Sequence, residues 1–233
     1  MASWWQIPAG GVQPLSSAAV TELDTTRAAY DSVAALYAEM FADIDVTPAL
    51  DRALIAAFAE LAGDPVADLG CGPGHMTAYL ASLGRTAFGV DLSAEMIAIA
   101  RAAHPDLRFE QGSMTDLDLA DGTLGGILAW YSTIHAAPER WPGILAEFHR
   151  LLAPGGRLLI GFFEAPAGAD GVGEPIPFDH RVTLAHRWPI PLVGRLLNEA
   201  GLVVDAYTFR EPEESERFQH GRVLARKPEH RPG

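Results

Sequence analysis

One short segment near residue 70 limits the folds open to this chain. Residues 66–70 form an apolar run typical of a buried strand, glycines stand at positions 70, 72 and 74, and a helical pattern begins at His75. Glycine has no side chain and tolerates positive φ, so alternate glycines permit a tight turn in which bare backbone approaches a ligand. A strand that leaves such a turn as a helix predicts an α/β fold with a ligand at the turn.

The rest of the chain agrees with that fold class. From about Thr47 onward, short runs of Val, Ile, Leu and Phe alternate with longer stretches whose apolar residues recur every three or four positions, which predicts strands joined by helices. The predicted strands are 66–70, 87–91, 107–111, 125–131, 157–163, 203–209 and 222–226. The predicted helices are 48–62, 75–83, 94–103, 138–152 and 189–200.

The connections predict strand direction. Enough residues separate the first five strands for crossovers, so we expect them to be parallel, whereas about a dozen mostly polar residues, centred on 211–219, predict a hairpin with a long loop between the last two. Ser93 is the expected N-cap of one helix, and Gly84 and Gly201 are expected helix stops.

Composition favours one domain and excludes some partners. The 233 residues, 48% hydrophobic and 20% charged, suffice for a sizeable core. A formal net charge of −13 would repel a phosphate backbone, and no run of five basic residues occurs. We therefore expect neither nucleic acid nor a membrane as a partner.

Two further features bear on location and metal. The chain starts without a basic segment followed by a long apolar stretch, and it has no run of about 18 apolar residues, so we expect a cytoplasmic protein. Cys71 is the single cysteine, which excludes an internal disulfide, and we expect no structural metal.

Two segments are expected to cover the site. We interpret residues 1–46 as an N-terminal lid or cap ahead of the main domain, 47–233. The Trp-containing stretch 1–14 has no hydrophobic periodicity, which is compatible with an ordered lid and with a frayed tail. The Gly-, Pro- and Ala-rich stretch 164–179 predicts a long loop within a substrate-cover insertion at about 164–187.

An acidic residue identifies the ligand class. Asp91 closes the second predicted strand 21 residues after Gly70, where a carboxylate can accept hydrogen bonds from two ribose hydroxyls. This spacing predicts an adenosine-type ligand. Nicotinamide enzymes carry G-x-G-x-x-G, which would require glycine where the chain has His75.

Residues 68–74, Asp-Leu-Gly-Cys-Gly-Pro-Gly, resemble the first signature motif of class I S-adenosylmethionine (SAM) dependent methyltransferases, acidic-x-Gly-x-Gly-x-Gly. Segments 89–96, 109–114 and 151–159 resemble the same family in the same order. The resemblance covers about residues 30–227. It implies a Rossmann-like, doubly wound, mainly parallel seven-stranded sheet, helices on both faces, with the last strand antiparallel next to the fifth.

The resemblance also implies cofactor-binding residues. Gly70 and Gly72 would line the methionine part of SAM, Asp68 would arrange the loop or meet the ammonium group, Cys71 would contribute backbone, and Asp91 would bind the ribose. The adenine would lie among Leu92, Met96, Gly112, Ser113 and Met114; many relatives carry Asp where this chain has Ser113, and Met96 alternatively belongs to the helix core.

An N-terminal helix is expected to close over the cofactor. Tyr30 and Tyr37 lie seven residues apart and so share one helical face. The segment around them, Tyr-Asp-x-x-Ala-x-x-Tyr, resembles the closing helix of the family; an amphipathic helix that merely docks on the core is the alternative.

The junction with the methyl acceptor is expected where the fourth strand ends. Trp130 would contact the cofactor, and Tyr131, Ser132 and His135 would contact the acceptor, because open α/β sheets bind ligands at the carboxyl ends of their strands. His135 is the candidate catalytic base, with a structural hydrogen-bonding role as the alternative. The Asn-Pro-Pro-Tyr type of sequence that base- and amide-methylating enzymes carry at this point is absent.

Within the cover, His180 and Arg181 are predicted to bind the acceptor, with solvation of a lid as the alternative. We expect no metal.

The function implied by the resemblance is methyl transfer from SAM, which leaves S-adenosylhomocysteine, to a small molecule of the kind found in bacterial secondary metabolism. O-methylation is favoured; N- or C-methylation and a SAM-binding protein without transferase activity stay open. An NAD-dependent oxidoreductase and an aminopropyl transferase are disfavoured, and a monomer and a homodimer are equally compatible with the sequence.

Overall fold

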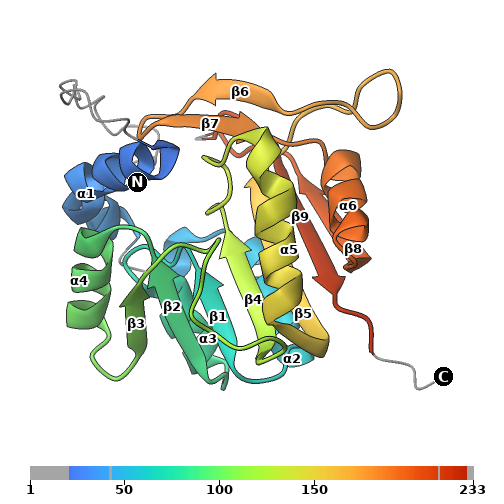
Figure 1. Ribbon diagram of the computed structural model, residues 1–233. Helices are drawn as coiled ribbons and strands as arrows, with labels where there is room; N and C mark the ends of the chain where they lie inside the picture. Colours follow the sequence, from blue (N-terminus) through green and yellow to red (C-terminus); the bar gives the residue numbers. More distant parts are fainter. Residues whose placement is uncertain (1–20, 42–43, 215, 230–233) are drawn as a thin grey trace.

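A computed structural model describes residues 21–41, 44–214 and 216–229. Its centre is a seven-stranded sheet in the order β3-β2-β1-β4-β5-β9-β8 (Figure 1). Strands β1 to β5 are parallel, and β9 runs antiparallel between β5 and β8. The strands are β1 Val66–Leu69, β2 Ala87–Asp91, β3 Arg108–Gln111, β4 Leu124–Trp130, β5 Leu152–Phe163, β8 Val203–Arg210 and β9 His220–Arg226.

Helices cover both faces of this sheet. Figure 1 shows α5 and α6 in front of the strands and α2 and α3 behind them, and α4 packs beside β2 and β3. The helices are α1 Glu22–Met40, α2 Ala49–Leu61, α3 His75–Ser82, α4 Ala94–Ala103, α5 Trp141–Leu151 and α6 Ile190–Glu199, with short 3-10 turns at Ile44–Val46 and Pro138–Arg140.

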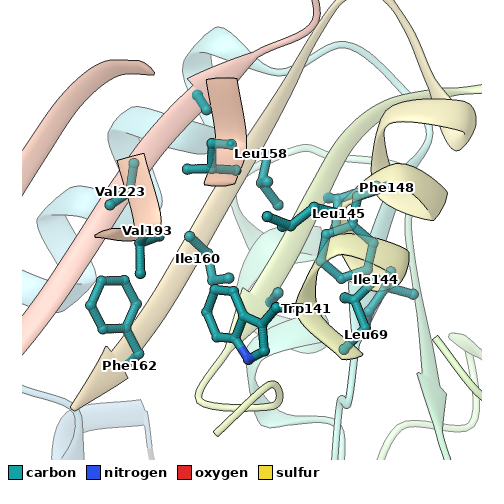
Figure 2. Close-up of a cluster of buried hydrophobic side chains, with 14 of the residues drawn as sticks. Leu69, Trp141, Ile144, Leu145, Phe148, Leu158, Ile160, Phe162, Val193 and Val223 are labelled. Atoms are coloured by element: carbon teal, nitrogen blue, oxygen red, sulfur yellow. The ribbon is translucent and has the colours of Figure 1, made fainter. Parts of the chain in front are cut away.

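The largest part of the core lies between the sheet and the front helices. Trp141 and Phe148 of α5 and Phe162 of β5 are fully buried there, and Figure 2 shows them with Val193 of α6 and Val223 of β9. Strands buried on both faces are expected when helices cover both sides of a parallel sheet, so the near-continuous apolar runs of β1 and β4 follow from the layer arrangement.

The predicted topology is confirmed: seven strands, five of them parallel, with the last strand antiparallel beside the fifth. Boundaries differ by a few residues. The helix predicted over 138–152 begins as a 3-10 turn and becomes α5 only at Trp141, where Pro142 suits the first turn because it has no amide to donate there.

The prediction of a long loop over residues 164–179 is partly wrong. Residues 164–175 are irregular, but Ile176–Asp179 form β6, which pairs antiparallel with β7, Leu184–Arg187, in a separate two-stranded sheet. Pro177 concealed this strand from the sequence pattern because proline is tolerated only in edge or two-stranded pairings of this kind.

The carboxyl ends of the parallel strands point toward α1 and the β6–β7 hairpin, which lie at the top of Figure 1. The segment 1–14 falls outside the described residues, so of the predicted lid 1–46 the structure describes α1 and the turn after it. None of the helices in the described ranges has the length and apolarity to cross a membrane.

Candidate active site

The glycine loop after β1 requires glycine for two separate reasons. Gly70, Gly72 and Gly74 have φ of 79°, 53° and 88°, which side chains rarely adopt. At Gly70 a Cβ would also lie 2.2 Å from the Cβ of Ser132. The end of β1 therefore packs directly against the segment that follows β4.

The amides of this loop all have partners within the protein. The N–H groups of Gly70 and Cys71 donate to the carbonyl of Val90 at 2.7 and 3.1 Å, and that of Gly74 donates to Cys71 at 3.0 Å. The Gly72 N–H donates to Asp91 Oδ2 at 2.8 Å. Since position 73 is proline, no amide of the loop remains for an anion such as a pyrophosphate, which favours a cationic ligand group here.

Asp91 is held by backbone on both carboxylate oxygens. Oδ2 accepts from Gly72, and Oδ1 accepts from the Ser93 N–H at 2.8 Å. Burial raises the pKa of this carboxyl, while the hydrogen bonds from Ser93 and Gly72 oppose that rise. Each oxygen can accept a further hydrogen bond, so Asp91, which lines the cavity, can take two vicinal hydroxyls.

Asp68 lies beneath the loop and does not line the cavity. Its side chain accepts a 2.7 Å hydrogen bond from Thr77 of α3. Burial raises its pKa to about 7, with Thr77 opposing the rise. Of the two roles expected for Asp68, the geometry supports the arrangement of the loop, because the carboxyl ties β1 to α3.

A single cavity joins the glycine loop, α1 and the carboxyl ends of β2 to β4. Of the predicted residues, it is lined by Tyr30, Tyr37, Gly70, Gly72, Asp91, Leu92, Met96, Gly112, Ser113, Met114, Trp130, Tyr131, Ser132 and His135. Sequence reasoning missed Glu22, Leu23, Thr26, Val90, Thr115, Ala136, Arg140 and Ile144, which also line it.

Helix α1 closes one side of this cavity. Leu23, Thr26, Tyr30 and Tyr37 lie three, four and seven residues apart on one face, a spacing that could have revealed the first two from the sequence. Asp31 ties α1 to the start of α4 by accepting a 2.5 Å hydrogen bond from the Ser93 hydroxyl. A Cβ on Gly72 would lie 3.8 Å from the Tyr37 ring, so α1 reaches across to the loop.

Two residues near the expected adenine position are already engaged within the protein. The hydroxyl of Ser113 lies 2.8 Å from that of Thr115. Met96 is 1% exposed and packs in the core, and it also lines the cavity. Ser93 caps α4 as predicted, by accepting from the Met96 N–H at 3.1 Å.

His135 is oriented by two hydrogen bonds. Its Nδ1 lies 2.9 Å from the carbonyl of Leu184, which can only accept, so Nδ1 carries the proton. Nε2 therefore accepts from the hydroxyl of Tyr30 at 2.8 Å. Burial lowers the pKa of His135 to about 4, so the ring is neutral at pH 7 and its Nε2 lone pair faces Tyr30.

Four predicted site residues lie outside the cavity wall. Asp68 and Cys71 are buried, and burial raises the pKa of the Cys71 thiol well above its usual range. His180 packs edge-on against His135 with 4.9 Å between ring centres, so it borders the site through another side chain. Arg181 is exposed in the turn between β6 and β7 and is not part of the wall.

Comparison with known proteins finds methyltransferases. Residues 66–156 match a family described as a methyltransferase domain. The chain is 36% identical over 104 residues to a malonyl-[acyl-carrier protein] O-methyltransferase of Pectobacterium atrosepticum, and this match covers 44% of this chain and 40% of that protein. It is 35% identical over 117 residues to a ubiquinone/menaquinone biosynthesis C-methyltransferase of Rubrivivax gelatinosus, and this match covers 50% of this chain and 46% of that protein. The chain thus spans less than half the length of either relative.

The fold is shared over nearly the whole chain with a solved structure. A Burkholderia thailandensis 1,6-didemethyltoxoflavin-N1-methyltransferase, with its acceptor and S-adenosylhomocysteine bound, superposes with a TM-score of 0.68 at 23% identity over 93% of this chain and 94% of that one. Residues 66–156 thus resemble a methyltransferase domain, and the chain has the fold of this N1-methyltransferase.

Proposed function

We propose that this protein transfers the methyl group of SAM to a small-molecule acceptor, with a hydroxyl oxygen as the favoured target and secondary metabolism as the setting. The observation that carries the proposal is the cavity itself. One wall offers a backbone-held carboxylate and a glycine loop suited to SAM, and the other offers a neutral histidine beside aromatic rings.

The residues present fit SAM. Asp91 has two oxygens able to accept from the ribose hydroxyls, and the glycine loop, which has no free amide, suits the cationic methionine part. Leu92, Met96, Gly112, Ser113 and Met114 are proposed to enclose the adenine, and Tyr30 and Tyr37 to close over the ligand. Bound there, SAM supplies a methyl carbon activated by its sulfonium.

His135 is proposed as the base that accepts the acceptor's proton. Its neutral ring has one lone pair, on Nε2, which accepts from the Tyr30 hydroxyl; the hydroxyl of the acceptor is proposed to replace that of Tyr30 at this position. Methyl transfer needs a nucleophilic lone pair close to the methyl carbon, so the remaining contribution of Trp130, Tyr131 and Ser132 is to position the acceptor and exclude water.

The atom that receives the methyl group is proposed as well. The names of similar proteins include an O-, a C- and an N1-methyltransferase, so these names do not distinguish oxygen from carbon or nitrogen as the target. The hydroxyl-facing geometry of His135 is what favours oxygen. A SAM-binding protein without transferase activity is the remaining alternative.

The test is isothermal titration with SAM and S-adenosylhomocysteine, with NAD as a control, followed by transfer of radiolabelled methyl from SAM to a panel of phenols, amines and carboxylic acids. Micromolar binding of both SAM ligands, no NAD binding and label in a phenol support the proposal. Binding of NAD alone would overturn the cofactor assignment. Label found only in amines or at carbon would overturn the choice of oxygen.

A further inference from the structure

A chain of buried polar side chains meets the acceptor end of the cavity at Tyr131. The Tyr131 hydroxyl hydrogen-bonds Nδ1 of His220, a residue that is 2% exposed. On the other side of that ring, Nε2 lies 3.1 Å from Oε1 of Glu216. Arg210 donates to both oxygens of the Glu216 carboxylate at 2.6 Å. None of these partners was identified from the sequence, and none of them lines the cavity.

A second ion pair supports the same wall. Arg222, 1% exposed, donates to both oxygens of Asp51 at 2.9 and 2.8 Å. Its guanidinium carbon lies 5.0 Å from the ring centre of Trp130 and 5.2 Å from that of Tyr131. The two arginines face two carboxylates, so these charges are balanced, and the rings against which Arg222 packs, Trp130 and Tyr131, line the cavity.

The hydrogen-bond direction follows from the partners. Burial raises the pKa of Tyr131, so the phenol is protonated and its one O–H is available to donate. The charges facing His220 are Glu216, Arg222 and Arg210, and burial outweighs Glu216 to lower the pKa of the imidazole, which is neutral at pH 7. A lone pair at Nε2 would face a carboxylate, so the proton lies on Nε2, and Nδ1 accepts from Tyr131.

The backbone at Tyr131 is strained. Its φ of 55° makes it the one non-glycine residue with positive φ in the described chain. A non-glycine residue in this region costs about 1–3 kcal/mol and persists only where its surroundings hold it, as they do at many functional sites. Here the Tyr131 N–H donates to Gly161 at 2.9 Å, and the ring packs on Phe163 with 5.1 Å between ring centres.

We propose that Tyr131 is a specificity-determining residue that accepts a hydrogen bond from a second polar group of the methyl acceptor, with His220 and Glu216 as its positioning residues. The Tyr131 proton is committed to His220, so the oxygen can only accept, and the group it selects is a donor, O–H or N–H, rather than a carboxylate. The rings of Trp130, Tyr131 and Tyr30 suit an aromatic acceptor. This inference rests on the proposed function and narrows its acceptor to an aromatic ring that bears a second donor.

The test measures binding of phenol and of the three dihydroxybenzene isomers to the protein, with and without S-adenosylhomocysteine, by NMR titration. We expect the best isomer to bind the wild type about three- to tenfold more tightly than phenol does, the effect of one hydrogen bond. Tyr131→Phe should remove that gain, so that the best isomer and phenol bind the variant with the same affinity. Equal binding of phenol and every isomer to the wild type, or a gain that survives Tyr131→Phe, would overturn the inference.

The positioning role has its own readout. In protein labelled with ¹⁵N-histidine, His220 should carry its proton on Nε2, and Glu216→Gln should move it to Nδ1 and reduce the gain from the second hydroxyl. The matched control is Glu213→Gln, an exposed carboxylate 4.0 Å from the same Arg210, which should change neither. A proton on Nδ1 in the wild type would refute the arrangement. Titration of the free protein keeps this result separate from failure to bind S-adenosylhomocysteine, which bears only on the proposed function.

Discussion

The two halves of the cavity are built in different ways. The cofactor half consists of backbone groups and one carboxylate close together in sequence: Gly72 and Asp91, bonded to each other, are 19 residues apart. The acceptor half consists of side chains from distant elements: Tyr30 and His135 are 105 residues apart, and Tyr131 and His220 are 89 apart. A local site can be read as a motif, whereas a site assembled from distant side chains exists only after folding.

The sharpest test of the cofactor half is Gly70→Ala against Gly84→Ala. Both glycines have positive φ, 79° and 85°, but only Gly70 is crowded, by Ser132, while nothing lies near Gly84. We expect Gly84→Ala to lower the free energy of unfolding by about 1–3 kcal/mol. Gly70→Ala should lower it by about 1–3 kcal/mol more because of overpacking. Only Gly70→Ala should lose SAM binding. Urea unfolding and calorimetry measure both; equal costs would show that the loop tolerates a side chain.

Asp91→Ala removes both acceptors proposed for the ribose hydroxyls. Because hydrogen bonds to a charged group contribute about 1.5–3 kcal/mol each, the Kd for S-adenosylhomocysteine should rise at least about 100-fold. Glu110→Gln, an exposed carboxylate at the end of the neighbouring strand β3, is the control and should stay within about threefold. A similar Kd for both variants would separate Asp91 from the cofactor.

His135→Ala tests the acceptor half. We expect turnover of the phenol found in the methyl-transfer panel to fall at least about tenfold, since general-base catalysis contributes that much or more, while the Kd for S-adenosylhomocysteine is nearly unchanged. His104→Ala, at the far end of α4, serves as the control. Normal turnover in His135→Ala would exclude the base assignment.

Acidification should affect the two halves with opposite sign. Burial raises the pKa of Asp68 to about 7 and lowers that of His135 to about 4. Between pH 7 and 5 the folded chain binds the proton on Asp68 more tightly than the unfolded chain does, so that residue's contribution to stability grows as pH falls. As the pH falls, His135 is protonated first in the unfolded chain, so the contribution of His135 to stability declines. Each effect is at most about 1.4 kcal/mol per pH unit.

Unfolding of Asp68→Asn and His135→Gln at pH 7 and pH 5 checks this prediction. Relative to the wild type, Asp68→Asn should become less stable at the lower pH and His135→Gln more stable. Shifts of the same sign in both variants would contradict it.

Much of the fold was readable because its signals are local. The parallel direction of the first five strands follows from crossover lengths, and the antiparallel last strand next to the fifth follows from the family resemblance; both are confirmed. The β6–β7 hairpin was missed because Pro177 breaks the strand pattern and because its pairing partner, β7, lies on the far side of a turn with no hairpin signature.

At the site, fourteen of the eighteen predicted residues line the cavity, and a further one, His180, borders it through His135. The misses have a physical cause. Helical spacing marks Leu23 and Thr26 as companions of Tyr30, but nothing local marks Arg140 or Ile144, which reach the cavity because of how the chain beyond β4 packs.

The sequence by itself determined the layered α/β architecture and the glycine loop beside Asp91, because glycine conformation, strand period and the position of Asp91 act within a few dozen residues. Only the tertiary structure decided on which ring nitrogen His135 and His220 carry their proton and how Tyr131 is held. His220, Glu216 and Arg210 are ordinary polar residues in the sequence, and burial gives them their roles, since a charge removed from water must find its partner wherever the fold places one.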